Sequence, residues 1–129
     1  MSKAETYHKY LSDEGYRPTI DKDGDVLFKY EGGSYYVIAN EDDPMYFQVL
    51  YPNFWVIEKP EDVDKAYRAA GDATRATKVA KVYLNEARDK VSADVEVYMK
   101  EQTDGQVFLE RSLAAIRHAV GEFVKGMGK

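Results

Sequence analysis

Residues 26–57 constrain the fold of this chain more than any other segment. In this run aromatic and β-branched side chains alternate with polar ones, and the run contains more than half of the chain's aromatic residues. Period-two alternation is typical of β-strands, and Gly, Asn, Asp and Pro between such runs favour turns. The turn segments are "DKDGD" at 21–25, "EGGS" at 31–34 and "NEDDP" at 40–44. The run therefore predicts three antiparallel strands, over 26–30, 35–39 and about 45–50.

The end of the third strand has two interpretations. Pro52 cannot donate a backbone hydrogen bond to a neighbouring strand, and Asn53 favours a turn. The following "FWVI" at 54–57 either continues the strand past a bulge or forms a separate short segment. The sequence leaves both open.

The other segments predict three helices and two more strands. Helices are expected over 3–14, over 60–78 after Pro60, and from about 103 to 127, where apolar residues recur every three or four positions. Strands are expected over 79–87 and 91–102, and in the latter Asp94, Glu96 and Tyr98 form a solvent-facing side. The predicted order is helix, three antiparallel strands, helix, two strands, helix. We expect one α+β domain over residues 1–129, packed as a two-layer sandwich.

Composition excludes several classes of partner. A chain of 129 residues suits one domain, and a net charge of −5 disfavours binding to nucleic acid or to an anionic membrane. The chain has no cysteine, which fits a reducing compartment. Its first 15 residues lack the apolar run of a signal peptide. We expect a cytoplasmic protein.

No segment carries a strong catalytic or metal-binding motif. In "DKDGD" the spacing of a calcium-binding loop fails, because Gly24 is fourth and the twelfth position is Gly32. The carboxylates of "EDDP" at 41–44 could hold a metal or act as an acid and base, but a solvated turn needs less coincidence. His8 and His118 each stand alone in a predicted helix. We therefore expect no enzyme, no cofactor and no metal site.

The aromatic residues of the strands exceed what one buried face can hold. Both strand parities carry bulky side chains at 35–38 and 45–51, whereas a sheet covered by helices on one side buries one face. Tyrosine and tryptophan suit protein interfaces, because they combine apolar area with a polar tip. The candidate protein-binding residues are Tyr35, Tyr46, Tyr51, Phe54 and Trp55. The alternative is a small-ligand sensor whose rings line a pocket between sheet and helices.

Three segments resemble the YbjN family of bacterial sensory transduction regulators, which shares the fold of type III secretion chaperones. They are "GDVLFKYEGGSYYVIANEDDPMYFQVLYP" at 24–52, "AAGDATRATKVAKVYL" at 69–84 and "VFLERSLAAIRHAVGEF" at 107–123. The resemblance extends over roughly residues 3–125. It implies a small cytoplasmic protein, often a homodimer, that binds a protein or peptide client or has a regulatory role. It brings no catalytic residue with it.

Overall fold

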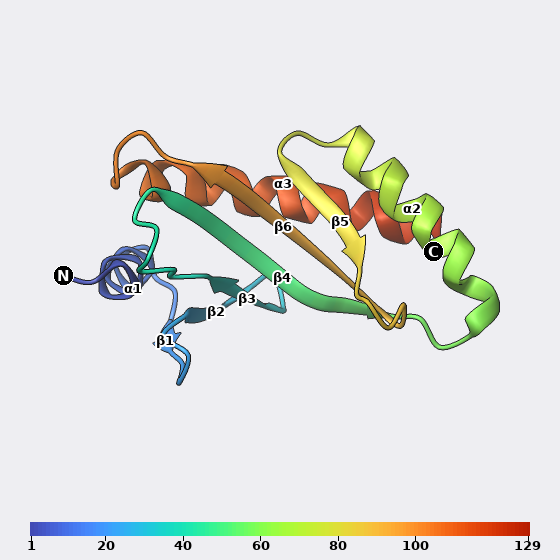
Figure 1. Ribbon diagram of the computed structural model, residues 1–129, viewed down its shortest axis with the longest axis horizontal. Helices are drawn as coiled ribbons and strands as arrows, with labels where there is room; N and C mark the ends of the chain where they lie inside the picture. Colours follow the sequence, from blue (N-terminus) through green and yellow to red (C-terminus); the bar gives the residue numbers. More distant parts are fainter.

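The computed structural model describes residues 1–129 and has an α+β architecture. One antiparallel sheet of six strands has the order β1-β2-β3-β4-β6-β5. The strands are β1 (Thr19–Ile20), β2 (Val26–Tyr30), β3 (Gly33–Val37), β4 (Tyr46–Val56), β5 (Ala80–Leu84) and β6 (Lys90–Tyr98). The helices are α1 (Lys3–Asp13), α2 (Val63–Ala76), preceded by a short 3₁₀ turn η1 (Pro60–Asp62), and α3 (Asp104–Gly126). Figure 1 shows β4 and β6 running side by side along the length of the molecule.

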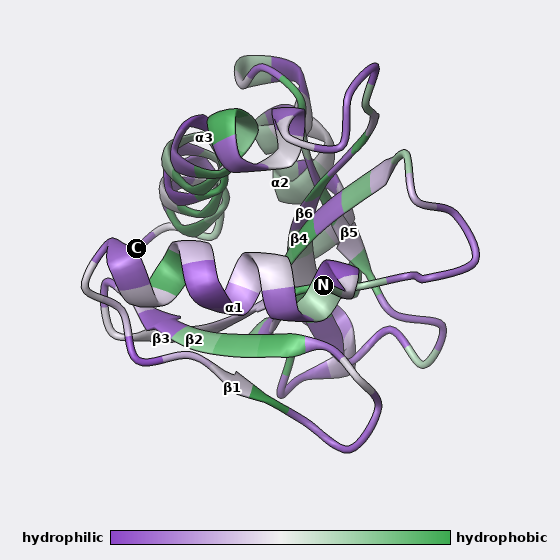
Figure 2. Cartoon of the chain, turned by 90° about the vertical axis from the view of Figure 1, so that its left-hand side faces the viewer, coloured by the Kyte–Doolittle hydropathy of each residue, from purple (hydrophilic) through white to green (hydrophobic).

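All three helices contribute to a single core on one face of the sheet. Figure 2 shows α1 and α3 on the same side of the sheet, with α1 next to β2 and β3 and α3 next to β4 and β6. Residues of one parity on each strand are buried beneath them, among them Val26, Phe28, Val37, Phe47, Val49, Val91 and Val95. The apolar stripe of α3 supplies Leu109, Leu113, Ile116 and Phe123 to the same core. The molecule is thus a two-layer structure in which the opposite face of the sheet has no helix over it.

The predicted layout of five strands is wrong by one strand. β1 consists of only Thr19 and Ile20, both exposed, and it pairs with Leu27 and Val26 of β2. Two exposed residues carry no period-two signal, so the sequence pattern could not identify this strand. α1 and α3 agree with their expected boundaries to within one residue, and β3, expected over 35–39, agrees to within two.

Residues 52–57 continue the third predicted strand past a bulge. β4 pairs with β6 from Tyr46 to Val56, and the register shifts between Tyr51 and Trp55. Within this bulge Asn53 has a positive φ of 52°, and its backbone N–H donates to the Oγ of Ser92 at 2.9 Å. Pro52 has no N–H to satisfy, and a side-chain acceptor on β6 pairs the N–H of Asn53 where the ladder is interrupted.

An aromatic ladder runs along the core side of β3 and β4. Tyr35 stacks on Tyr51 with ring centroids 4.2 Å apart, Tyr51 lies 5.4 Å from Phe54, and Phe54 lies 5.5 Å from Phe123 of α3. Gly33 makes this ladder possible, since a Cβ there would lie 2.6 Å from the hydroxyl oxygen of Tyr51. These rings join the sheet to the last helix.

Candidate functional site

One face of the sheet has no helix over it. Its side chains have the parity opposite to that of the core, and they combine aromatic, aliphatic and charged groups. We call this surface the open face. Its members include Leu27, Lys29, Ser34, Tyr36, Tyr46, Gln48, Leu50, Lys81, Tyr83, Ser92, Asp94, Glu96 and Tyr98.

A continuous row of side chains crosses the open face. Strand register pairs Leu27 with Tyr36, Tyr36 with Leu50, Leu50 with Asp94, and Asp94 with Lys81. Directly opposed residues in antiparallel strands lie on the same face and touch. The row therefore passes from an apolar half on β2, β3 and β4 to a charged half on β6 and β5.

Asp94 is a buried carboxylate where the apolar half of this row meets the charged half. Its side chain is 1% exposed. One carboxylate oxygen, Oδ2, accepts a hydrogen bond from Gln48 Nε2 at 2.8 Å and a longer one from the Tyr83 hydroxyl at 3.5 Å. The other oxygen, Oδ1, is buried and has no hydrogen-bond donor. Burial raises the pKa of Asp94 above its usual value, and the neighbouring Glu96 carboxylate adds to that rise. The Gln48 hydrogen bond and the charge of Lys81 offset only part of it.

Glu96 lies two residues further along β6 and, in contrast, each of its carboxylate oxygens accepts a hydrogen bond. Lys81 Nζ donates to one of its oxygens and the Tyr46 hydroxyl donates to the other. These hydrogen bonds, Lys81 first, lower the pKa of Glu96. Lys81 Nζ also lies 3.8 Å from Asp94 Oδ1 and 5.6 Å from the centroid of the Tyr83 ring. Burial and the charge of Asp94 raise the pKa of Tyr83 to about 12.

The two edge strands of the sheet are short or partly covered. At the β5 edge, the outward N–H of Val82 donates to Thr74 Oγ1 of α2 at 2.9 Å, and the Thr74 hydroxyl returns a bond of 3.4 Å to the Val82 carbonyl. The opposite edge is β1, which has only two residues. Short or covered edges resist pairing with another chain, so the open face is the part of the sheet that remains available.

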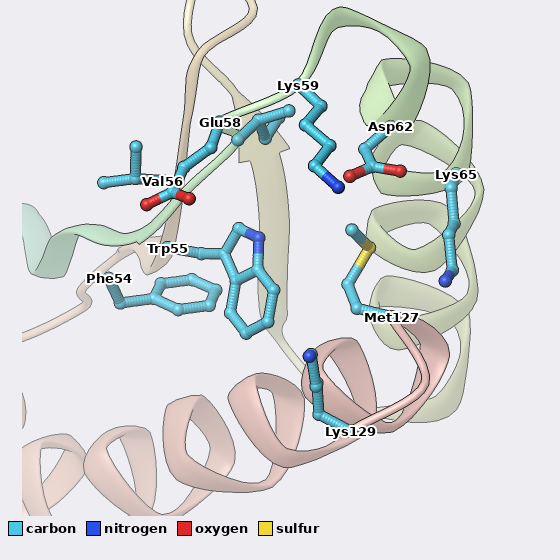
Figure 3. Close-up of a pocket in the computed structure, with 10 residues that line it drawn as sticks. Phe54, Trp55, Val56, Glu58, Lys59, Asp62, Lys65, Met127 and Lys129 are labelled. Carbon is cyan, nitrogen blue, oxygen red and sulfur yellow. The ribbon is translucent and has the colours of Figure 1, made fainter.

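A cleft separate from the open face lies between the end of β4, the start of α2 and the end of α3. It has a volume of about 570 Å³ and is lined by Phe54, Trp55, Val56, Ile57, Glu58, Lys59, Asp62, Lys65, Met127 and Lys129. Figure 3 shows the Lys59 side chain directed toward Asp62, the Lys129 side chain extending toward the Trp55 indole, and the carboxylate of Glu58 turned away from the indole. None of the three lysines forms an ion pair in the structure.

The five predicted binding residues fall into three places. Tyr35 is only 2% exposed and lies in the core, so its ring has no surface to offer a partner. Tyr46 lies on the open face. Tyr51, Phe54 and Trp55 are partly buried against the core through the aromatic ladder, and Phe54 and Trp55 also line the cleft. The structure therefore does not bring the five together on one surface.

The acidic segments serve as turns and caps. In 21–25, Asp21 Oδ1 accepts hydrogen bonds from the backbone N–H groups of Asp23 at 2.9 Å and Asp25 at 3.0 Å, the pattern of a local turn. In 41–44, Glu41 accepts from the backbone N–H of Lys3 at 3.1 Å, at the start of α1. A carboxylate at a helix N-terminus is stabilising. No group of three or more His, Asp or Glu side chains is arranged to hold a metal ion.

Sequence reasoning missed the residues that make the open face unusual. It placed Asp94 with Glu96 and Tyr98 on a solvated side of a strand, and two of these are exposed while Asp94 is sealed. Lys81, Gln48 and Tyr83 come from two other strands, and only the register brings them to Asp94. The alternation of residues 91–98 gives the correct face, but no sequence signal marks one carboxylate of that face as buried.

The fold defines a class of small α+β proteins with one antiparallel six-stranded sheet and helices on a single face. No family model matches the chain, and no curated protein sequence matches it. Among solved structures, the fold is similar to that of YbjN from E. coli, provisionally described as a transcription regulator, with a TM-score of 0.65 and 12% identity over 90% of this chain and 87% of that one. The fold is therefore YbjN-like.

A second solved structure is similar over nearly the whole chain. It is an uncharacterised protein from Methanothermobacter thermautotrophicus, with a TM-score of 0.53 and 13% identity over 97% of this chain and 94% of that one. At these identities the likeness concerns the fold alone. None of the helices has both the length and the apolar character needed to cross a membrane.

Proposed function

We propose that this chain is a noncatalytic regulatory module, a distant member of the YbjN family, that binds a polypeptide partner on the open face of its sheet. The observation that carries the proposal is the composition of this face. Leu27, Tyr36 and Leu50 form an apolar band with no helix over it, and charged groups adjoin that band. Protein interfaces combine an apolar centre with polar groups around it in this way.

A regulatory role through protein contact fits the charge of the chain better than direct contact with DNA. The YbjN-like fold occurs in a protein provisionally described as a transcription regulator. A chain with a net charge of −5 gains little from counterion release at phosphates, which supplies much of DNA affinity. Binding to a polypeptide does not depend on attraction to phosphates. We also propose that this chain and its polypeptide partner are cytoplasmic.

A displayed library of random peptides tests the proposal without knowledge of the natural partner. Peptides enriched on the wild-type protein are then titrated against two variants with the same change of charge. Tyr36→Lys alters the apolar band of the open face, and Val107→Lys alters an exposed position on α3 that is 69% accessible. We expect Tyr36→Lys to weaken binding by at least about tenfold, the loss typical of an interface centre, and Val107→Lys to leave it unchanged.

Each other result of this titration counts against the proposal. Equal binding to both variants would place the peptides elsewhere on the molecule. A library that yields no enriched peptide would remove the polypeptide-binding function. Melting curves of both variants keep a folding defect from being read as lost binding.

We also propose that the chain forms a homodimer, as the YbjN and type III secretion chaperone resemblance implies. A stable dimer interface buries on the order of 1,200–2,000 Å² in total. Light scattering at micromolar concentration should give twice the mass of one chain, and the mass of one chain would contradict the dimer. If Tyr36→Lys converts the dimer to a monomer, a second copy rather than a different polypeptide occupies the open face.

A small-ligand sensor is the second candidate, and the cleft beside Trp55 is the observation that favours it. The cleft combines an indole, the Phe54 ring and three lysines without ion pairs. Glu58 and Asp62 also line it, so the lining side chains are positive by one charge and suit a planar anion. Trp55 is the only tryptophan of the chain, so its fluorescence reports on this cleft alone. A screen of aromatic carboxylates and nucleotides should change this fluorescence, and the response should fall in Lys59→Ala but not in the distant Lys22→Ala.

A further inference from the structure

The carboxylate of Asp94 has one acceptor that the chain itself leaves empty. Buried polar groups in folded proteins nearly always have hydrogen-bond partners, and an unpaired buried carboxylate oxygen is costly. Oδ2 of Asp94 is satisfied by Gln48 and Tyr83, whereas Oδ1 accepts no bond. Asp94 projects onto the open face, and Lys81 Nζ, 3.8 Å from Oδ1, is the cation that covers this oxygen in the free protein. A donor from a partner can therefore reach Oδ1 when Lys81 moves aside.

Lys81 approaches this oxygen without bonding to it. Its Nζ lies 3.8 Å from Asp94 Oδ1, beyond hydrogen-bond distance, while it donates to Glu96. The side chain of Lys81 is 51% exposed, so it can leave at little steric cost. The Tyr83 ring, 5.6 Å from this Nζ, adds an aromatic surface for a cation.

We propose that Asp94 and Glu96 form a receptor for an arginine side chain of the polypeptide partner, and that Lys81 occupies this receptor as an internal substitute in the free protein. A planar guanidinium has parallel donors that can reach two carboxylate oxygens at once, whereas an ammonium group acts as a point charge. The partner's guanidinium would bond to Asp94 Oδ1 and Glu96 and lie against Tyr83. This inference rests on the proposed function, because it assigns the chemistry of a partner for the same face.

A purely structural role for Asp94 explains the site less well. A structural buried carboxylate is stabilised when its hydrogen bonds are complete, and a well-packed apolar residue is often as stable. Oδ1 of Asp94 instead has no hydrogen-bond donor, and the neighbouring Glu96 already binds one cation, the ammonium group of Lys81. The ammonium group of Lys81, 3.8 Å from the unpaired oxygen, donates its hydrogen bond to Glu96 and not to Asp94.

The test measures the affinity of library-selected peptides that contain arginine, by fluorescence anisotropy. Each peptide is compared with a copy in which citrulline, of similar shape but neutral, replaces the arginine. The protein variants are Asp94→Asn and Lys81→Met, with Lys81→Arg as the control that keeps the internal cation. Unfolding curves verify that each variant is folded.

We expect three results. Asp94→Asn should weaken binding of the arginine peptide about 30-fold or more, the loss typical when one partner of a buried charged pair is removed, and should abolish the preference over citrulline. Lys81→Met should strengthen binding severalfold, because the competing internal cation is gone. Lys81→Arg should not strengthen it.

The opposite results overturn the receptor. Peptides that lose affinity for Tyr36→Lys but bind wild type and Asp94→Asn equally would preserve the open face as the binding surface and remove the arginine receptor. Weaker binding to Lys81→Met would show that Lys81 supports the site rather than occupying it. Peptides that bind nowhere on the open face would overturn both the receptor and the proposed function.

Discussion

Replacing Asp94 with asparagine should stabilise the folded protein at neutral pH. In the wild type one oxygen of a buried carboxylate has no donor, and leaving such a group unsatisfied costs about 1–3 kcal/mol. Asparagine keeps an acceptor for Gln48, removes the buried charge and replaces the unpaired oxygen with an amide NH₂ that can donate to the neighbouring Glu96 carboxylate. The lost attraction to Lys81, whose Nζ is 3.8 Å away, offsets part of the gain. We expect a net increase of roughly 1 kcal/mol in the free energy of unfolding.

Urea unfolding at pH 7, followed by tyrosine and tryptophan fluorescence, measures this difference directly. For a domain of 129 residues, 1 kcal/mol corresponds to a rise of roughly 4 °C in melting temperature. The matched control is Asp72→Asn, which removes an exposed ion pair with Arg75. Exposed pairs contribute little, so the control should change stability by less than about 0.5 kcal/mol.

The advantage of Asp94→Asn should depend on pH in a defined direction. Because the folded pKa of Asp94 is raised above its usual value of 3.8, its protonated form is favoured by folding. The wild type therefore loses stability as pH rises through the folded pKa, and the two proteins converge in acid. Glu96 has the opposite sign, since its lowered pKa gives stability that is lost as pH falls. A destabilised Asp94→Asn at pH 7 would show that Asp94 is a structural residue and would refute the reasoning.

Three further predictions concern the scaffold. Gly71→Ala on α2 places a methyl group in open space and should raise stability by about 0.5–1 kcal/mol in thermal unfolding, whereas Gly105→Ala, whose Cβ would lie 1.9 Å from the Tyr7 hydroxyl oxygen, should lower it. Thr74→Val removes both hydrogen bonds to Val82 at the β5 edge. It should lower the free energy of unfolding by about 1–2 kcal/mol and increase aggregation measured by light scattering, and unchanged stability and aggregation would contradict the capping role. Phe123→Ala leaves Trp55 without its packing partner 5.5 Å away, and should cost about 3–5 kcal/mol with a red shift of tryptophan emission that Val107→Ala does not produce.

Local sequence patterns predicted the elements that local interactions determine. The turn at 21–25 depends on Asp21 and on Gly24, whose φ is 85°, so a short segment contains its own explanation. The apolar stripe of the last helix likewise lies within one segment. The bulge in β4 is different, because the Asn53 N–H is satisfied by Ser92, 39 residues away in sequence. No local pattern could choose between the continuation of that strand and a separate segment.

For the candidate site, the sequence predicted which residues share a face of a strand, but not which of them are buried. Period-two alternation separates Tyr35 from Tyr36, but it does not say which of the two faces the helices cover, and Tyr35 proved to be the buried one. The surplus of aromatic residues predicted rings outside the core, and Tyr46 lies on the open face, where its hydroxyl donates to Glu96. A role for this tyrosine in binding a partner stays a prediction. Asp94 could not be identified, because its burial depends on side chains from β4 and β5 that the register places around it.

The most direct test of the account is the position of bound peptide on the protein, mapped by NMR amide chemical shifts. Addition of a library-selected peptide should shift signals of the open face, with the largest changes at Tyr36, Gln48, Leu50 and Asp94. Shifts confined to Trp55, Met127 and the rest of the cleft would contradict the claim that the open face is where this chain meets its partner.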